Sequence, residues 1–124
     1  MLRDRLLDAL QPSGLVFRLA AEAQWQQTRL PGVEIRTLFH NPQTERVTVC
    51  VRMAAGAVYP GHLHHMVEEC LVLEGDLRVG DITLGPGDYQ AALPGSKHPR
   101  QRTTNGCLLL LTLPAADLAL TGAM

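Results

Sequence analysis

The amino-acid sequence predicts an all-β protein built as a sandwich or a barrel. Several segments alternate apolar and polar residues with the two-residue period of a β-strand. Turns that contain glycine, proline or asparagine separate these segments at short intervals. A chain of 124 residues fits one domain and can form a hydrophobic core without disulfides or a structural metal. We therefore expect a single domain that spans residues 1–124.

The first residues show a helical pattern instead. Leu2, Leu6 and Leu10 lie on one face at helical spacing, and the pattern ends at the turn residues 12–14. We assign residues 1–14 to a short N-terminal helix and its link, which would pack on the domain or on a partner.

The expected β-barrel covers residues 15–113. Residues 15–19 are a candidate first strand, and the polar stretch 20–31 is expected to be a loop anchored by Trp25. The segments with the clearest strand pattern are 33–39, 47–53, 71–73 and 107–113, and they are separated by turns at 41–42, 79–82 and 85–88. Residues 114–124 form a C-terminal tail, in which 115–120 are a candidate short helix.

The composition excludes several function classes. A net charge of −1 gives no electrostatic footprint for nucleic acid. The longest apolar run, residues 107–113, is far shorter than the ~20 residues that cross a bilayer, and the N-terminal residues lack the pattern of a signal peptide. We therefore expect neither a nucleic acid nor a membrane as a partner.

The number and spacing of the cysteines indicate the redox state of the compartment in which the protein works. Cys50, Cys70 and Cys107 are odd in number, widely spaced and without a C-x-x-C motif. This usage favours a reduced, cytoplasmic protein, with Cys50 and Cys107 as core residues of apolar strands.

The residues that can carry chemistry gather between Gly56 and Gly75. His62 and His64 stand two apart, so on an extended strand both imidazoles point to the same side. Glu68 can supply a carboxylate from the next strand, and His98 follows a later proline–glycine turn as a fourth candidate. Imidazole and carboxylate ligands suit zinc, iron, manganese, nickel and copper alike.

These residues match the first sequence motif of the cupin superfamily, G-x5-H-x-H-x3,4-E-x6-G. Gly56, His62, His64, Glu68 and Gly75 occupy its conserved positions in order.

The second cupin motif, G-x5-P-x-G-x2-H-x3-N, is matched in part. Gly87, Gly95 and His98 keep its spacing. Pro94 lies one place late, and Arg102 stands where the motif has asparagine.

Over roughly residues 25–113 the sequence resembles the ChrR-type cupin, the C-terminal domain of zinc-binding anti-sigma factors. The resemblance implies a small double-stranded β-helix, the cupin jelly roll. It also implies that His62, His64, Glu68 and His98 bind one divalent metal ion per chain. Zinc is the first candidate, with iron, manganese or nickel as alternatives. The anti-sigma relatives carry an H-x3-C-x2-C motif that binds the sigma factor, and because this chain lacks it we do not expect direct sigma-factor binding.

Two neighbours compete with the assigned ligands. Glu69 is adjacent to Glu68, so on a strand the two carboxylates face opposite sides. The six-residue gap before Gly75 in the cupin motif selects Glu68. His65 is expected to face solvent or the mouth of the pocket.

Arg100, Cys70 and Tyr89 are candidate pocket residues. Arg100 and Arg102 would share a strand face with His98, and one of them would bind an acidic ligand through its guanidinium group, or else both would belong to a solvated basic strand. Cys70 would lie on the Glu68 side of its strand, as a redox-sensitive neighbour or as a core residue. Tyr89, like Tyr59, would line the pocket.

Three functions fit this set of residues. The first is a zinc-dependent sensing or regulatory protein, as the ChrR resemblance implies. The second is a metal-dependent dioxygenase-type enzyme that acts on a small diketone or organic acid. The third is a small-molecule binding barrel with a structural metal. Cupins often pair through an exposed sheet, so we also expect a homodimer.

Overall fold

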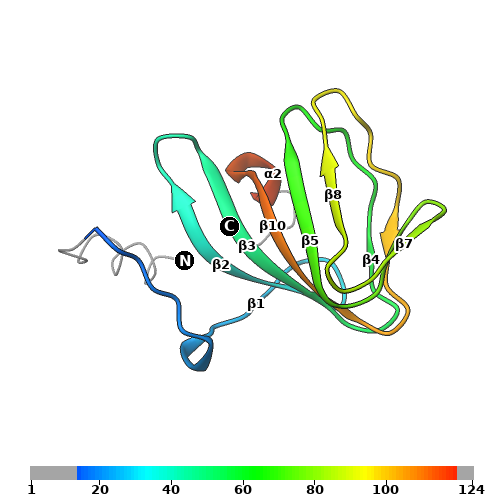
Figure 1. Cartoon of the computed structure of the whole chain (residues 1–124), viewed down its shortest axis with the longest axis horizontal. Helices are drawn as coiled ribbons and strands as arrows, with labels where there is room; N and C mark the ends of the chain where they lie inside the picture. Colours follow the sequence, from blue (N-terminus) through cyan, green and yellow to red (C-terminus); the bar gives the residue numbers. More distant parts are fainter. Residues whose placement is uncertain (1–13, 120–124) are drawn as a thin grey trace.

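The computed structural model describes residues 14–119, which form two antiparallel β-sheets (Figure 1). The larger sheet has six strands in the order β1-β2-β3-β10-β5-β8, and the smaller has four in the order β4-β9-β6-β7. This arrangement confirms the predicted all-β cupin jelly roll. The helical pattern from Leu2 to Leu10, in the expected N-terminal helix and link of residues 1–14, lies outside the described range. No helix within residues 14–119 is long and apolar enough to cross a membrane.

The strands are short, and two brief helices flank them. The larger sheet contains β1 (Gln26–Gln27), β2 (Val33–Asn41), β3 (Arg46–Met53), β5 (Glu68–Gly75), β8 (Tyr89–Ala92) and β10 (Cys107–Pro114). The smaller sheet contains β4 (Val58–Tyr59), β6 (Leu77–Val79), β7 (Ile82–Leu84) and β9 (Gln101–Arg102). A 3-10 helix, η1 (Ala20–Glu22), precedes β1, and α2 (Ala115–Ala119) follows β10.

The core lies on the inner face of the larger sheet. Alternate residues along β2, β3 and β10 are buried, as the sequence pattern predicts. Val33, Val49 and Val72 have no exposed surface, and Leu118 of α2 is buried with them. Each such side chain contributes about 1.5–3 kcal/mol when it leaves water. These rows are therefore the main source of hydrophobic stabilisation.

The predicted alternation fails at the end of β2. The register with β3 shifts between Thr37 and Phe39, so Leu38 is an extra residue in the strand. Such a bulge reverses the facing of the residues beyond it. Phe39 is consequently 37% exposed instead of facing the core.

The prediction of a first strand at residues 15–19 is wrong. These residues form no strand in the described part of the chain, and the segment lies to one side of the sheets and runs into η1 (Figure 1). Leu15, Phe17 and Leu19 are 57–62% exposed. Their alternation marks an extended segment but does not supply a neighbouring strand edge.

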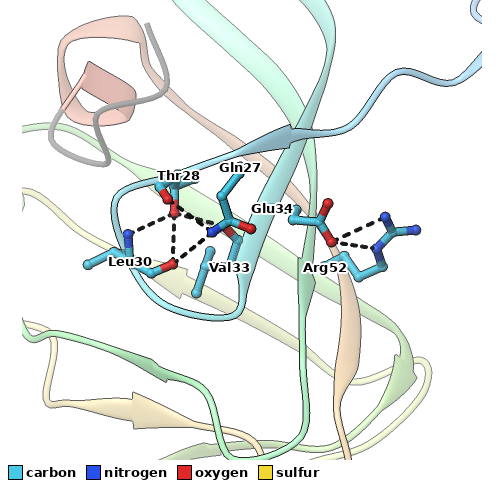
Figure 2. A network of polar contacts seen from close by, with 6 residues as sticks. All are labelled: Gln27, Thr28, Leu30, Val33, Glu34 and Arg52. Atoms are coloured by element: carbon cyan, nitrogen blue, oxygen red, sulfur yellow. Dashed lines mark hydrogen bonds and ion pairs between the residues drawn. The ribbon is translucent and has the colours of Figure 1, made fainter.

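A polar network fixes the turn between β1 and β2 (Figure 2). The Thr28 hydroxyl is buried; it donates to the Val33 carbonyl at 2.8 Å and accepts from the Leu30 amide at 3.1 Å. The Gln27 side-chain amide lies 2.9–3.2 Å from three carbonyls of the same turn. This network fixes the backbone that carries Arg29 and Leu30.

Side-chain contacts on the outer face of the sheet hold β2, β3 and the Trp25 segment together beside this turn. Arg52 of β3 forms an ion pair with Glu34 of β2 at 3.2 Å (Figure 2). The same guanidinium lies 4.1 Å from the centre of the Trp25 ring, a cation–π contact. Trp25 thus anchors its segment, as predicted, although this segment contains η1 and β1 and is not simply a loop.

Replacing Thr28 with valine should destabilise the fold by about 1–3 kcal/mol. The change keeps the shape of the side chain but removes the acceptor of the Leu30 amide and one of the three donors to the Val33 carbonyl. Urea unfolding measures the effect. Thr83→Val, at an exposed position of β7, is the matched control and should change stability little. Equal stability of the two variants would contradict the role of the network.

Candidate metal centre

The two histidines of the first motif lie on an extended segment that follows β4. The segment pairs with residues 95–98 through backbone hydrogen bonds: the His98 amide donates to His62, and the His64 amide to Ser96, each at 2.8 Å. Its only ladder bridge among the described residues joins Leu63 to Lys97. This pairing keeps the alternation expected of a strand, since Leu63 is 52% exposed and His64 is fully buried.

Gly61 allows the two segments to approach each other. A Cβ atom at this position would lie 2.6 Å from the carbonyl oxygen of His98. Real Cβ atoms essentially never come so close to another heavy atom. A residue with a side chain would therefore push His98 away from His62 and His64.

His62, His64 and Glu68 form one cluster. A ligand atom of each lies within 4.8 Å of the others. The Glu68 Oε2 atom is 3.3 Å from Nδ1 of His64 and 3.6 Å from Nε2 of His62. The His98 ring lies beside the cluster, with its centre 4.5 Å from that of His64 and 5.4 Å from that of His62. The structure thus brings together all four residues that the sequence singles out.

The cluster contains buried polar atoms without partners. Both ring nitrogens of His64 and the Oε2 atom of Glu68 are buried and make no hydrogen bond with the described residues. Each buried polar atom left unsatisfied costs about 1–3 kcal/mol. A divalent cation held between imidazole nitrogens and a carboxylate would remove this cost. The residues present therefore fit a metal ion.

The orientation of His62 also suits a ligand. Its Nδ1 atom lies 3.2 Å from the carbonyl of Pro60, which accepts the hydrogen bond if that nitrogen carries the proton. This leaves Nε2 as the bare nitrogen on the side of Glu68. Metal-binding histidines are commonly fixed in this way by a carbonyl at the second nitrogen.

The pKa values of the three histidines shift in different directions. Burial lowers the pKa of His64 and of His98 below the ordinary value near 6.5. Contact with the Glu68 carboxylate raises the pKa of His62. At neutral pH, His64 and His98 are therefore uncharged and keep the lone pairs that a metal requires.

Glu68 and Glu69 have different environments. Glu68 is 7% exposed and faces inward, whereas Glu69 is exposed and accepts a hydrogen bond from the Tyr89 hydroxyl at 2.7 Å. The predicted choice of Glu68 is consistent with this facing. His65 is exposed, as expected.

Two of the three candidate pocket residues lie at exposed positions. Tyr89 is 53% exposed on the outer face of the sheet, because it pairs there with Glu69. Arg100 is also exposed, since residues 98–100 are not a regular strand and the alternation from His98 is interrupted. Cys70 lies on the inner face near Glu68, and burial raises its pKa to about 12, so its thiol stays protonated like that of a core residue.

Gln101 takes the inward position that was expected for Arg100. It is 7% exposed and accepts a hydrogen bond from the Gln90 side chain at 2.9 Å. Both glutamines line the barrel interior beside Glu68 and Cys70. The one-residue shift has no signal in the sequence apart from Pro99, which cannot donate a ladder hydrogen bond.

A cavity of about 240 Å³ adjoins the cluster. Tyr59, His62 and Glu68 form its inner wall, and Asp117 of α2 lines it as well. Arg29 stands at its exposed rim. Tyr59 was an expected pocket residue, and burial raises its pKa to about 12. Asp117 was not expected, because it lies in the tail beyond the predicted barrel.

Residues 15–116 match a sequence-family model that is described as the ChrR Cupin-like domain. No curated protein sequence matches the chain.

Solved structures share the fold. An acetylacetone dioxygenase from Acinetobacter johnsonii is 17% identical, with a TM-score of 0.68 over 81% of this chain and 72% of that chain. KdgF from Halomonas sp. is 26% identical, with a TM-score of 0.67 over 81% and 94%. The complex of Rhodobacter sphaeroides SigE with the anti-sigma ChrR gives 25% identity and a TM-score of 0.64, over 77% of this chain and 50% of the matched chain.

Gly61→Ala should disturb the candidate metal centre. Its methyl group would displace the His98 carbonyl, so we expect a loss of about 1–3 kcal/mol of stability together with weaker metal binding. Urea unfolding with and without added zinc measures both effects. Gly85→Ala is the control, because the nearest atom to its Cβ is 3.9 Å away. Equal metal affinity in the two variants would contradict the role of Gly61.

Metal binding should weaken as the pH falls. His62 takes a proton first because Glu68 raises its pKa, and protonation blocks its ligand nitrogen. His64 and His98 follow at lower pH because burial lowers their pKa values. We expect zinc affinity, measured by chelator competition, to decline from about pH 7 downward. Constant affinity from about pH 8 to pH 5.5 would show that these imidazoles are not ligands.

Proposed function

The chain belongs to the ChrR Cupin-like domain family, and from this premise we propose that it is a metal-dependent sensing or regulatory protein. In this proposal His62, His64, Glu68 and His98 hold one divalent ion, with zinc as the first candidate. The bound ion would act as a Lewis acid toward a ligand in the adjoining cavity.

One observation carries the metal part of the proposal. His64 has no exposed surface, and neither of its ring nitrogens makes a hydrogen bond with residues 14–119, although Nδ1 lies 3.3 Å from Oε2 of Glu68. A buried histidine that serves only packing would be expected to form a hydrogen bond through at least one nitrogen. Ligation of a metal ion explains both its burial and the adjacent unpartnered oxygen of Glu68.

The regulatory part is supported by the family and by the ligand set. Four protein ligands fill the coordination shell that zinc prefers, which is typical of structural and sensing sites. The chain spans half of its match in the SigE–ChrR complex and lacks the H-x3-C-x2-C motif. We therefore propose a response to a small ligand in the cavity and no direct contact with a sigma factor.

Elemental analysis tests the metal site. Protein purified without a tag or chelator should contain about one zinc per chain, and His64→Ala should lose it because a central ligand is removed. His65→Ala is the matched control, since this neighbour is exposed, and it should keep the metal. Glu68→Gln and Glu69→Gln form a second pair with the same expected contrast. Loss of metal from His65→Ala or Glu69→Gln alone would refute the assignment.

A metal-dependent dioxygenase is the second candidate function. The cavity that adjoins His62 and Glu68 favours it, because a substrate there would lie beside the metal ion. Iron, manganese or nickel in octahedral coordination would leave open positions that zinc with four ligands does not. The likeness to the Acinetobacter johnsonii enzyme, at 17% identity, supports the shared fold only.

Oxygen uptake distinguishes the two functions. Iron-loaded protein is incubated with pentane-2,4-dione and, separately, with small hydroxy acids. The regulatory proposal predicts no uptake above that of the zinc-loaded chain. Uptake that depends on substrate and is abolished in Glu68→Gln, but not in Glu69→Gln, would establish the enzyme instead.

A further inference from the structure

We propose that the cavity beside the metal centre binds a small compound that carries both a hydroxyl and a carbonyl group, with the hydroxyl directed at Asp117. The proposal rests on the proposed function, because it places the ligand next to the metal ion. It adds a recognition residue outside the cupin motifs and a chemical class for the ligand.

The first argument is the position of Asp117. It is the third residue of α2, the short helix that continues directly from β10. Asp117 lines the cavity together with Tyr59, His62 and Glu68, so a ligand that occupies this space lies beside Asp117 and the metal-binding side chains at once.

The second argument is that one carboxylate oxygen of Asp117 lacks a hydrogen-bond donor. Its Oδ2 atom is buried and makes no hydrogen bond with the described residues. Other carboxylates of the chain are satisfied: Asp76 accepts from two backbone amides at 2.8 Å, Asp88 from one at 2.8 Å, and Glu69 from a tyrosine hydroxyl at 2.7 Å. The unpartnered oxygen of Glu68 is explained by the proposed metal ion. The unpartnered oxygen of Asp117 has no such explanation within residues 14–119.

The remaining walls define the rest of the ligand. An ionised carboxylate only accepts hydrogen bonds, so the group that faces Asp117 must donate one. The Tyr59 phenol can donate to a carbonyl oxygen, as well as accept. Leu30 and Leu113 add apolar surface. A cavity of about 240 Å³ lies below the usual range for ligand pockets, about 300–1,000 Å³, which favours a compact molecule.

A matched pair of probes tests the proposal. Hydroxyacetone and butan-2-one have the same size and carbonyl group, and differ in a hydroxyl against a methyl. Binding of each to the zinc-loaded full chain is followed by ligand-observed NMR titration. We expect hydroxyacetone to bind about tenfold more tightly, because it satisfies the Asp117 carboxylate.

Variants test whether Asp117 is the source of the preference for hydroxyacetone. Asp117→Ala should abolish it, and Asp117→Asn should keep only part of it, because an amide also accepts one hydrogen bond. Glu69→Gln, on the outer face of the sheet, is the control and should leave the preference unchanged. Metal content and circular dichroism are measured for every variant, and if Asp117→Ala does not fold, the Asp117→Asn variant decides.

The outcomes separate this proposal from the proposed function. A wild-type chain with one metal ion that binds neither probe, or binds both equally, would overturn the hydroxycarbonyl ligand and leave the metal site intact. The same holds if Asp117→Ala, with its metal retained, still prefers hydroxyacetone. A wild-type chain that cannot be loaded with metal would overturn both proposals.

Discussion

The site depends on the backbone pairing between the segment around His62 and the segment around His98. These residues come from separate loops, and the hydrogen bonds at 2.8 Å between them hold their imidazoles in place. The pairing is close because Gly61 has no side chain, and a Cβ atom there would overlap the His98 carbonyl. Glu68 is the first residue of β5, which belongs to the larger sheet. The candidate metal centre is thus formed where these two segments, which adjoin β4 and β9 of the smaller sheet, meet the first residue of β5.

A cluster of this kind is costly in an apolar barrel. His64 and Glu68 are buried like core residues, yet they leave polar atoms without partners. The valine and leucine rows of β2, β3 and β10 stabilise the fold enough to tolerate the cost. Residues that oppose folding in this way are expected where a chain has been shaped for binding. Two residues of the cluster, His62 and Glu68, also line a cavity, and this location links the cluster to function.

The fold and the four central residues could be predicted from the sequence more completely than the residues that surround them. Strand alternation and the cupin motifs depend on spacing along the chain, so they predicted the barrel and the inward facing of His62, His64 and Glu68. The facing of Phe39 and Arg100 could not be predicted, since a bulge or an interrupted strand reverses alternation without changing composition. The exposure of residues 15–19 was missed for a related reason: a strand also needs a free edge, which only the assembled sheet defines.

The two sides of the candidate metal centre differ, and this difference determines how a ligand can reach it. On the inner side, Glu68 faces a void of about 20 Å³ lined by Met53, Leu109 and the Gln90–Gln101 pair, too small for more than about one water molecule. On the opposite side lies the cavity of about 240 Å³, with Arg29 at its rim and α2 along its wall. A ligand therefore approaches past the β1–β2 turn and the helix after β10. Neither element contains a cupin motif residue, so chains with the same four ligands can present different surfaces to what the metal binds.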